Sequence, residues 1–81
     1  MYIAVKEVEA RENYVLYLTF ANGEHRCFSL VPYLGRGIFQ QLNNLEVFQT
    51  ATVSFDTVCW GGDIDIDPET LYEDSVPCLD H

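Results

Sequence analysis

The sequence predicts a small α+β protein: one antiparallel sheet of about five strands, in the order β-β-β-α-β-β-α, with the helices packed on the sheet. Two alternating apolar segments joined by Asn22-Gly23 predict a hairpin. Apolar residues spaced three and four apart over 38–48 predict a helical segment. The pair Asp67-Pro68 is typical of a helix start.

The first third of the chain is expected to form three strands. Residues 3–10 predict an edge strand with a bulge, because Val5 and Val8 differ in parity. Residues 14–20 and 24–30 flank the Asn-Gly pair, which supplies the positive-φ residues that a tight hairpin requires. The residues expected to face the core are Leu16, Leu18, Phe20, Phe28 and Leu30.

The middle of the chain is expected to be helical. A short turn over 38–42 precedes a helix over 44–50, and Asn43 with Glu46 three residues later resembles a capping box. One face of this segment should pack on the sheet. The exposed face has too few positive charges for a DNA-reading helix.

Two more strands follow. A fourth strand is expected over 51–55, with Phe55 on the same face as its alternate apolar neighbours. A fifth begins at Val58 with matching parity and includes Trp60, which is most simply the largest packing residue of a small core.

A last helix is expected over 68–75. Asp67 occupies the cap position before it, and Pro77 ends it. In the preceding strand, Ile64 and Ile66 alternate inward and leave the intervening aspartates on a solvated face.

Charge is the most distinctive property of the sequence. The net charge is −9, and all four basic side chains precede residue 37. Phosphate backbones and anionic membrane surfaces bind Lys and Arg, so we expect neither direct nucleic-acid binding nor membrane binding. A basic protein partner fits this charge, and so does an acidic surface that only maintains solubility. The four basic residues are Lys6, Arg11, Arg26 and Arg36.

Three cysteines, Cys27, Cys59 and Cys78, lie too far apart for a Cys-x-x-Cys motif. An odd count without a signal peptide predicts a reducing cytoplasm and not a disulfide scaffold. We interpret Cys59 as a packed residue and Cys78 as part of a short tail, 77–81, of a single domain that spans 1–81. No apolar run is long enough to span a membrane.

His25 and Cys27 are the nearest approach to a base and nucleophile, because they are two apart on a strand and share a face. Nothing in the sequence positions a third group to orient the imidazole. We therefore expect ordinary strand residues here, with no catalytic residue and no cofactor, and we do not expect an enzyme.

The segment GGDIDIDPETLY places Asp63, Asp65 and Asp67 at alternate positions, which raises the question of a calcium loop. However, Pro68 stands where that loop requires Gly. On a strand, alternate carboxylates lie about 6.5–7 Å apart, too far for one ion. We predict no metal site; Asp63 and Asp65 are the weak candidates, and Asp67 is assigned to the helix cap.

Four stretches occur in order along the chain: YVLYLTFANGE, FSLVPYL, LGRGIFQQL and CWGGDIDIDPETLY. Together they resemble the small, mostly bacterial family known as domain of unknown function 2442, over about residues 3–76. The resemblance implies a compact α+β fold of three strands, a helical segment, two strands and a final helix. It implies no known activity, cofactor or substrate. The structural signature corresponds here to Asn22, Gly23, Trp60, Gly62, Asp67, Pro68, Leu71 and Tyr72.

Two further features of that family bear on partners. Some members carry a helix-turn-helix after this domain; the sequence stops at His81, and we expect no such DNA-binding role here. Other members are similar to components of two-gene modules, which implies a partner protein.

The leading hypothesis is a non-enzymatic, acidic protein-interaction module of the bacterial cytoplasm with a basic partner. The alternative is a small ligand- or metal-binding domain that uses the segment 63–67 and the surroundings of Trp60. We expect a monomer or a weak homodimer, because −9 charges per subunit oppose self-association. The residues expected to contact the partner are Asp63, Asp65, Glu69 and Glu73.

Overall fold

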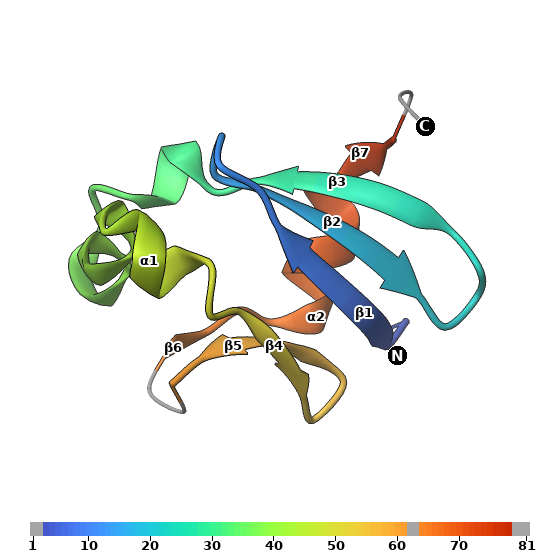
Figure 1. The fold of residues 1–81 in the computed structure, drawn as a ribbon. Coiled ribbons are helices and arrows are strands. Elements are labelled where there is room, and N and C mark those ends of the chain that lie inside the picture. The colour runs from blue at the N-terminus through green and yellow to red at the C-terminus, as the bar shows by residue number, and fades with distance from the viewer. Residues whose placement is uncertain (1–2, 62–63, 79–81) are drawn as a thin grey trace.

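The computed structural model describes residues 3–61 and 64–78 and has an α+β architecture with two antiparallel sheets (Figure 1). The first sheet has the order β1-β2-β3-β7 and the second the order β4-β5-β6. The strands of the first sheet are β1 (Val5–Ala10), β2 (Val15–Phe20), β3 (His25–Ser29) and β7 (Val76–Pro77). Those of the second are β4 (Thr52–Ser54), β5 (Thr57–Trp60) and β6 (Ile64–Asp65). The α+β class is therefore confirmed, whereas the single sheet is replaced by two.

The two sheets meet at β1. The Val5 N–H donates to the carbonyl of Asp56, in the turn between β4 and β5, at 3.0 Å. The register of β1 against β2 shifts between Val5 and Glu7, so the predicted bulge is present, and β1 is an edge strand as expected. A bulge bends its strand and increases the local twist. This bend turns the start of β1 toward the second sheet.

The β2–β3 hairpin follows the predicted pattern of buried residues, with a different turn. Its loop spans 21–23, closed by Gly23 N–H to the carbonyl of Phe20 at 2.9 Å. Gly23 has a φ of +89°, but Asn22 does not share the positive φ that we expected for both residues. Instead, the Asn22 Oδ1 accepts a hydrogen bond from the Glu24 N–H at 3.0 Å. This arrangement is a three-residue loop with Gly at the left-handed position.

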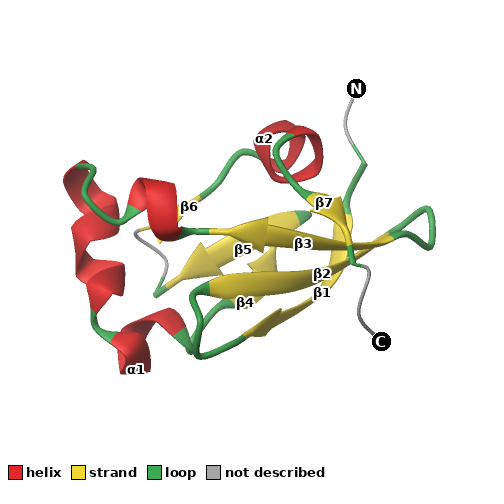
Figure 2. Cartoon of the chain, turned by 90° about the horizontal axis from the view of Figure 1, so that it is seen from above, coloured by secondary structure: helices red, strands yellow, loops and turns green. Residues whose placement is uncertain are grey.

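The helical segment consists of two 3₁₀ helices, η1 (Val31–Tyr33) and η2 (Gly37–Asn43), and the α-helix α1 (Leu45–Phe48). Figure 2 shows α1 at one end of the strands, away from α2. The cap of α1 is Asn44, one residue later than predicted, and its side chain accepts from the Glu46 N–H at 3.0 Å. The expected turn over 38–42 extends through Asn43, which moves the helix start by one residue.

The β4–β5 connection corrects the prediction for Phe55. Ser54 pairs with Thr57, and the two residues between them, Phe55 and Asp56, have φ values of 52° and 70°. Two positive φ values in a two-residue loop are the mark of a type I′ turn. Phe55 therefore lies at the hairpin tip with 95% of its surface exposed, and does not face inward.

From Ile64 to Glu73, the structure has the strand and the helix that the sequence predicts. Ile64 and Ile66 are buried, as predicted. Helix α2 (Pro68–Glu73) starts at Pro68 after Asp67, but among the described residues the Asp67 side chain makes no capping hydrogen bond. The chain then forms β7 beside β3, so Pro77, which we expected to follow the helix and begin the tail, belongs to a strand. The physical cause is the unpaired edge of β3, which β7 fills.

One hydrophobic core joins both sheets and the helices. Tyr72 of α2 packs edge-on against Phe20 of β2, with ring centroids 5.1 Å apart. The Thr57 hydroxyl donates to the carbonyl of Ile66 and fixes the chain that leads into α2. The largest fully buried side chains are Trp60, Phe20, Phe28, Phe48, Leu16, Leu18, Leu30, Leu42, Leu71 and Val58.

Candidate functional site

The acidic segment that ends in α2 lies at the surface. Asp65 is exposed on β6, between the buried Ile64 and Ile66. Glu69 and Glu73 are both exposed on α2, and four residues separate them, so they lie one turn apart on one face. Gly62 and Asp63, which the sequence placed in the signature and the contact set, lie outside the described residues.

Helix α2, which carries Glu69 and Glu73, is anchored to the core. Leu71 is fully buried beneath α2, and the Leu71 N–H donates to the carbonyl of Asp67 at 3.0 Å. Asp67 is exposed and lies at the helix start, where a negative charge is favourable even without a direct capping bond. Within residues 3–61 and 64–78, no group of three or more His, Cys, Asp or Glu side chains could hold a metal ion.

Trp60 lies in the core and not at a surface cavity. Its ring is 2% exposed and stacks on Phe48, with centroids 6.2 Å apart. Its indole N–H donates to the carbonyl of Phe48 at 2.8 Å. This bond satisfies the only polar atom of the side chain and ties β5 to α1.

A hydrogen-bond network centred on Glu24 joins the first hairpin to α2. The Tyr72 hydroxyl donates to Glu24 Oε2 at 2.6 Å, and Asn22 Nδ2 donates to the same oxygen at 2.7 Å. Arg26 Nη1 donates to Glu24 Oε1 at 2.9 Å. Two signature residues that are fifty positions apart, Asn22 and Tyr72, therefore share one carboxylate.

Arg26 extends this network to the end of α2. Its Nε donates to Ser75 Oγ at 2.6 Å, and its Nη2 donates to the Ser75 carbonyl at 2.9 Å. Its guanidinium also lies 4.6 Å from the centre of the Tyr72 ring. The hydrogen bond from Tyr72, followed by that from Arg26, lowers the pKa of Glu24. The same bond, together with burial, raises the pKa of Tyr72.

The cysteines differ from the prediction. Cys27 on β3 and Cys78 after β7 form a disulfide with a Cα–Cα distance of 5.4 Å, so the tail position that we expected for Cys78 is wrong. Cys59 is a half-buried free thiol, in agreement with a packed residue. His25 stands on the same strand face as Cys27, with Nδ1 3.3 Å from Thr19 Oγ1. The Cys27 sulfur is bonded to Cys78, so it offers no thiolate to His25 in this state.

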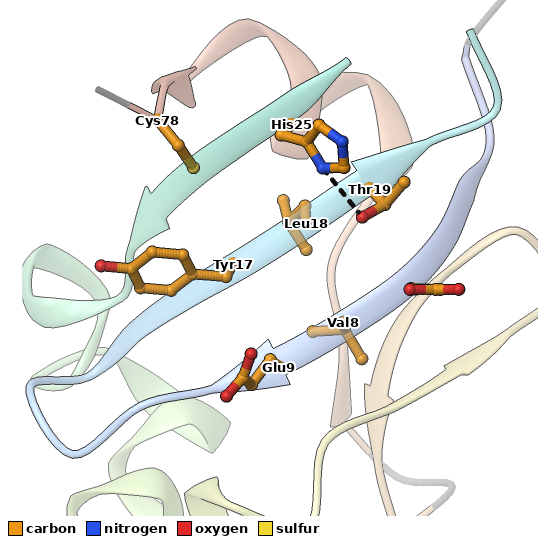
Figure 3. A pocket seen from close by; sticks show the side chains of 8 residues that line it. Val8, Glu9, Tyr17, Leu18, Thr19, His25 and Cys78 are labelled. Carbon is orange, nitrogen blue, oxygen red and sulfur yellow. Dashed lines mark hydrogen bonds between the residues drawn. The ribbon is translucent and has the colours of Figure 1, made fainter. Parts of the chain in front are cut away.

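Two of the shallow hollows at the surface of the described residues adjoin β2 and η1. One, of about 360 Å³, lies on the first sheet and has Tyr17, Thr19 and His25 among its lining residues (Figure 3). The other, of about 340 Å³, lies between η1 and the end of α2. In the second, the Tyr33 hydroxyl donates to Asp74 Oδ2 at 3.1 Å. Burial, and next this hydrogen bond, raises the pKa of Tyr33.

The protein is a small, acidic α+β fold with exposed carboxylates on α2, β6 and β1. A family model matches residues 5–77, and the chain belongs to that family, which is described as Protein of unknown function (DUF2442). The comparison with curated proteins and the comparison with solved structures both found no match. Among the described residues, no helix has the length and apolar character to cross a membrane.

Two arrangements in the structure were not predicted from the sequence. The Glu24 network was not found, although Asn22-x-Glu24-x-Arg26 is a local pattern of alternating polar residues that runs from the hairpin loop into β3. Its partners, Tyr72 and Ser75, lie about fifty residues away, and no local pattern indicates that pairing. The disulfide was missed for the same reason, because 51 positions separate the two cysteines.

Proposed function

We propose that this protein is a non-enzymatic, acidic protein-interaction module of the cytoplasm and that its partner is a basic protein. The observation that carries the proposal is the exposure of Asp65, Glu69 and Glu73 within a stretch, 37–81, that contains no Lys or Arg. A surface of one sign of charge attracts a partner of the other sign and repels nucleic acid.

The proposed contact has a rigid base. Helix α2 is held by the burial of Leu71 and by the Tyr72–Glu24 hydrogen bond, so its two outward carboxylates keep a constant spacing. Because the backbone beneath these charges is already ordered, little backbone entropy is lost on binding. Asp65 lies on the strand just before the helix and extends the acidic surface.

The partner should bind in a salt-dependent manner. The experiment is a pull-down with the full chain as bait, from lysate of the source cells, at about 0.05 M and about 0.3 M salt. A basic protein retained at low salt and lost at higher salt supports the proposal. Recovery of no stoichiometric partner, or of one that salt does not affect, contradicts it.

A pair of matched variants localises the contact. Asp65→Asn with Glu73→Gln removes two charges from the proposed surface, and Glu12→Gln with Glu46→Gln removes two exposed charges elsewhere. The first variant should lose the partner at low salt, and the second should retain it. Glu69 is left intact, because it has an interaction of its own within the fold. Equal loss from both variants would mean that only net charge matters.

The proposed location has its own test. In a reducing cytoplasm Cys27 and Cys78 would be thiols, whereas an oxidising compartment would preserve their disulfide. Rapid alkylation of protein in its native cells, followed by mass spectrometry, separates the two cases. Alkylation at Cys27, Cys59 and Cys78 supports the cytoplasm, and alkylation at Cys59 alone contradicts it.

A further inference from the structure

We propose that the outer face of the first sheet is a second docking surface, which binds an extended cationic segment of a partner protein at Glu7. The strand register builds this outer face from two rows of side chains. The first row is Glu7, Thr19 and His25, and the second is Glu9, Tyr17, Cys27 and Val76. Leu16 and Leu18 alternate with them in β2 and are buried, so the two rows point away from the core.

The outer face is accessible and hollowed. Glu7, Glu9 and His25 are exposed, while Tyr17 and Thr19 are half-buried at the base of the hollow. Figure 3 shows Glu9 on β1, Tyr17 and Thr19 on β2, and His25 at the start of β3. The hollow is an open depression that crosses three strands. Small ligands prefer enclosed pockets, so this depression does not suit them. Its shape suits a length of polypeptide.

The chain itself demonstrates which chemistry this surface accepts. Arg11 Nε lies 2.9 Å from Glu9 Oε2, and Arg11 Nη2 donates to Glu9 Oε1 at 3.2 Å. The guanidinium carbon lies 4.2 Å from the centre of the Tyr17 ring. A guanidinium is therefore held at one end of the outer face by a two-point carboxylate contact and by an aromatic ring.

Glu7 offers a similar carboxylate at the other end without a cation. Within the part of the chain that the structure describes, its side chain makes no hydrogen bond or ion pair, and Thr19 and His25 continue its row across the sheet. Glu7 and Glu9 are two apart on β1, which spaces them by about 6.5–7 Å. An extended peptide spaces its alternate side chains by the same distance. An Arg or Lys of such a segment can reach Glu7 while its backbone crosses the hollow.

This surface is distinct from the acidic segment proposed above. It lies on β1 to β3, whereas Asp65, Glu69 and Glu73 lie on β6 and α2. The two proposals can therefore fail separately, and one titration distinguishes them.

The experiment is an NMR titration of the ¹⁵N-labelled, disulfide-intact full chain with a capped Gly-Arg-Gly-Arg-Gly peptide. We expect the largest amide shifts at Glu7, Thr19 and His25, and no comparable shifts with the matching Gly-Glu-Gly-Glu-Gly peptide. Shifts confined to 64–74 would overturn this proposal and leave the proposed function supported. Shifts spread over all acidic regions alike would overturn it as well.

Two variants make the result quantitative. Glu7→Gln should weaken binding of the arginine peptide about three- to five-fold, the upper part of the range of an exposed ion pair. Glu46→Gln removes an equal charge from α1 and should leave the affinity within error. Equal weakening by both variants would overturn the proposal, because general attraction to an acidic protein would then explain the binding.

Discussion

At the residue scale, Glu24 connects two signature residues, Asn22 and Tyr72, that are distant in the sequence. One of its oxygens accepts from both Asn22 and Tyr72, and the other accepts from Arg26. Because Asn22 and Arg26 belong to the hairpin and Tyr72 belongs to α2, the carboxylate stabilises the hairpin and its packing on α2 together. Hydrogen bonds to a charged group are stronger than those between neutral groups.

Stability should depend on pH through this network. The pKa of Glu24 is lowered, so its contribution is present above its ordinary pKa of 4.5 and is lost as pH falls through the folded value. Between about pH 7 and about pH 3, Glu24→Gln should therefore lose less stability than wild type in urea unfolding. Parallel curves for the two proteins would contradict this prediction.

At alkaline pH, the contribution of Tyr72 to stability should decrease as pH rises, which is the opposite direction from Glu24. The pKa of Tyr72 is raised, so its contribution is present below its ordinary pKa of 10.0 and is lost as pH rises through the folded value. Tyr72→Phe should be less stable than wild type at neutral pH, and the difference should shrink above about pH 10. Urea unfolding at both pH values measures it, and a constant difference would show that the hydroxyl is not the cause.

Phe55 has a left-handed backbone conformation, which Asn adopts more readily than Phe. It has a φ of 52° and is 95% exposed, so it combines left-handed strain with little packing. Phe55→Asn should raise the free energy of unfolding by about 0.5–1 kcal/mol, because Asn tolerates this conformation. Phe55→Ala is the control and should give no such gain. A loss of stability in the Asn variant would indicate that the ring makes contacts in solution.

At the scale of elements, β7 depends on a covalent link. Two residues, Val76 and Pro77, make this strand, and the Cys27–Cys78 disulfide fastens it to β3. In the chain-entropy model, a disulfide between cysteines 51 positions apart stabilises the folded state by about 4 kcal/mol, because it restricts the unfolded chain. Cys78→Ser should lower the free energy of unfolding by an amount of that order in oxidised protein, measured by urea unfolding.

Controls separate the disulfide from packing. Cys59→Ser should change stability much less than Cys78→Ser, because Cys59 is a free thiol. Under a thiol reductant, wild type and Cys78→Ser should become nearly equal. If the two proteins keep their difference after reduction, side-chain packing and not the disulfide accounts for it.

Local patterns predicted elements well and their long-range partners poorly. The alternating apolar residues around Leu18 and the Pro68 helix start agree with the structure, because each depends only on neighbours in sequence. Phe55 continued an alternating pattern yet lies in a turn, since pairing of Ser54 with Thr57 decides the strand end. The acidic residues could be predicted as exposed, but the outer sheet face could not, because the register between strands defines it.

At the scale of the whole molecule, charge and fold oppose each other. A net charge of −9 on 81 residues produces repulsion that the compact state concentrates. Added sodium chloride should therefore raise the melting temperature. At matched ionic strength, Ca²⁺, Mg²⁺ and Mn²⁺ should each give about the same rise as sodium chloride. A selective rise with one of these ions would instead support the metal-binding alternative, because a ligand of the native state stabilises it.

The pairing of β3 with β7 also affects synthesis of the chain on the ribosome. The β2–β3 hairpin can form early, but the outer edge of β3 waits for Val76 and Pro77, about fifty residues later. At about 5–20 residues per second, this edge stays open for about 2.5–10 seconds. Nascent chains on neighbouring ribosomes could pair through such an edge, so slow translation of the last third should increase misassembly.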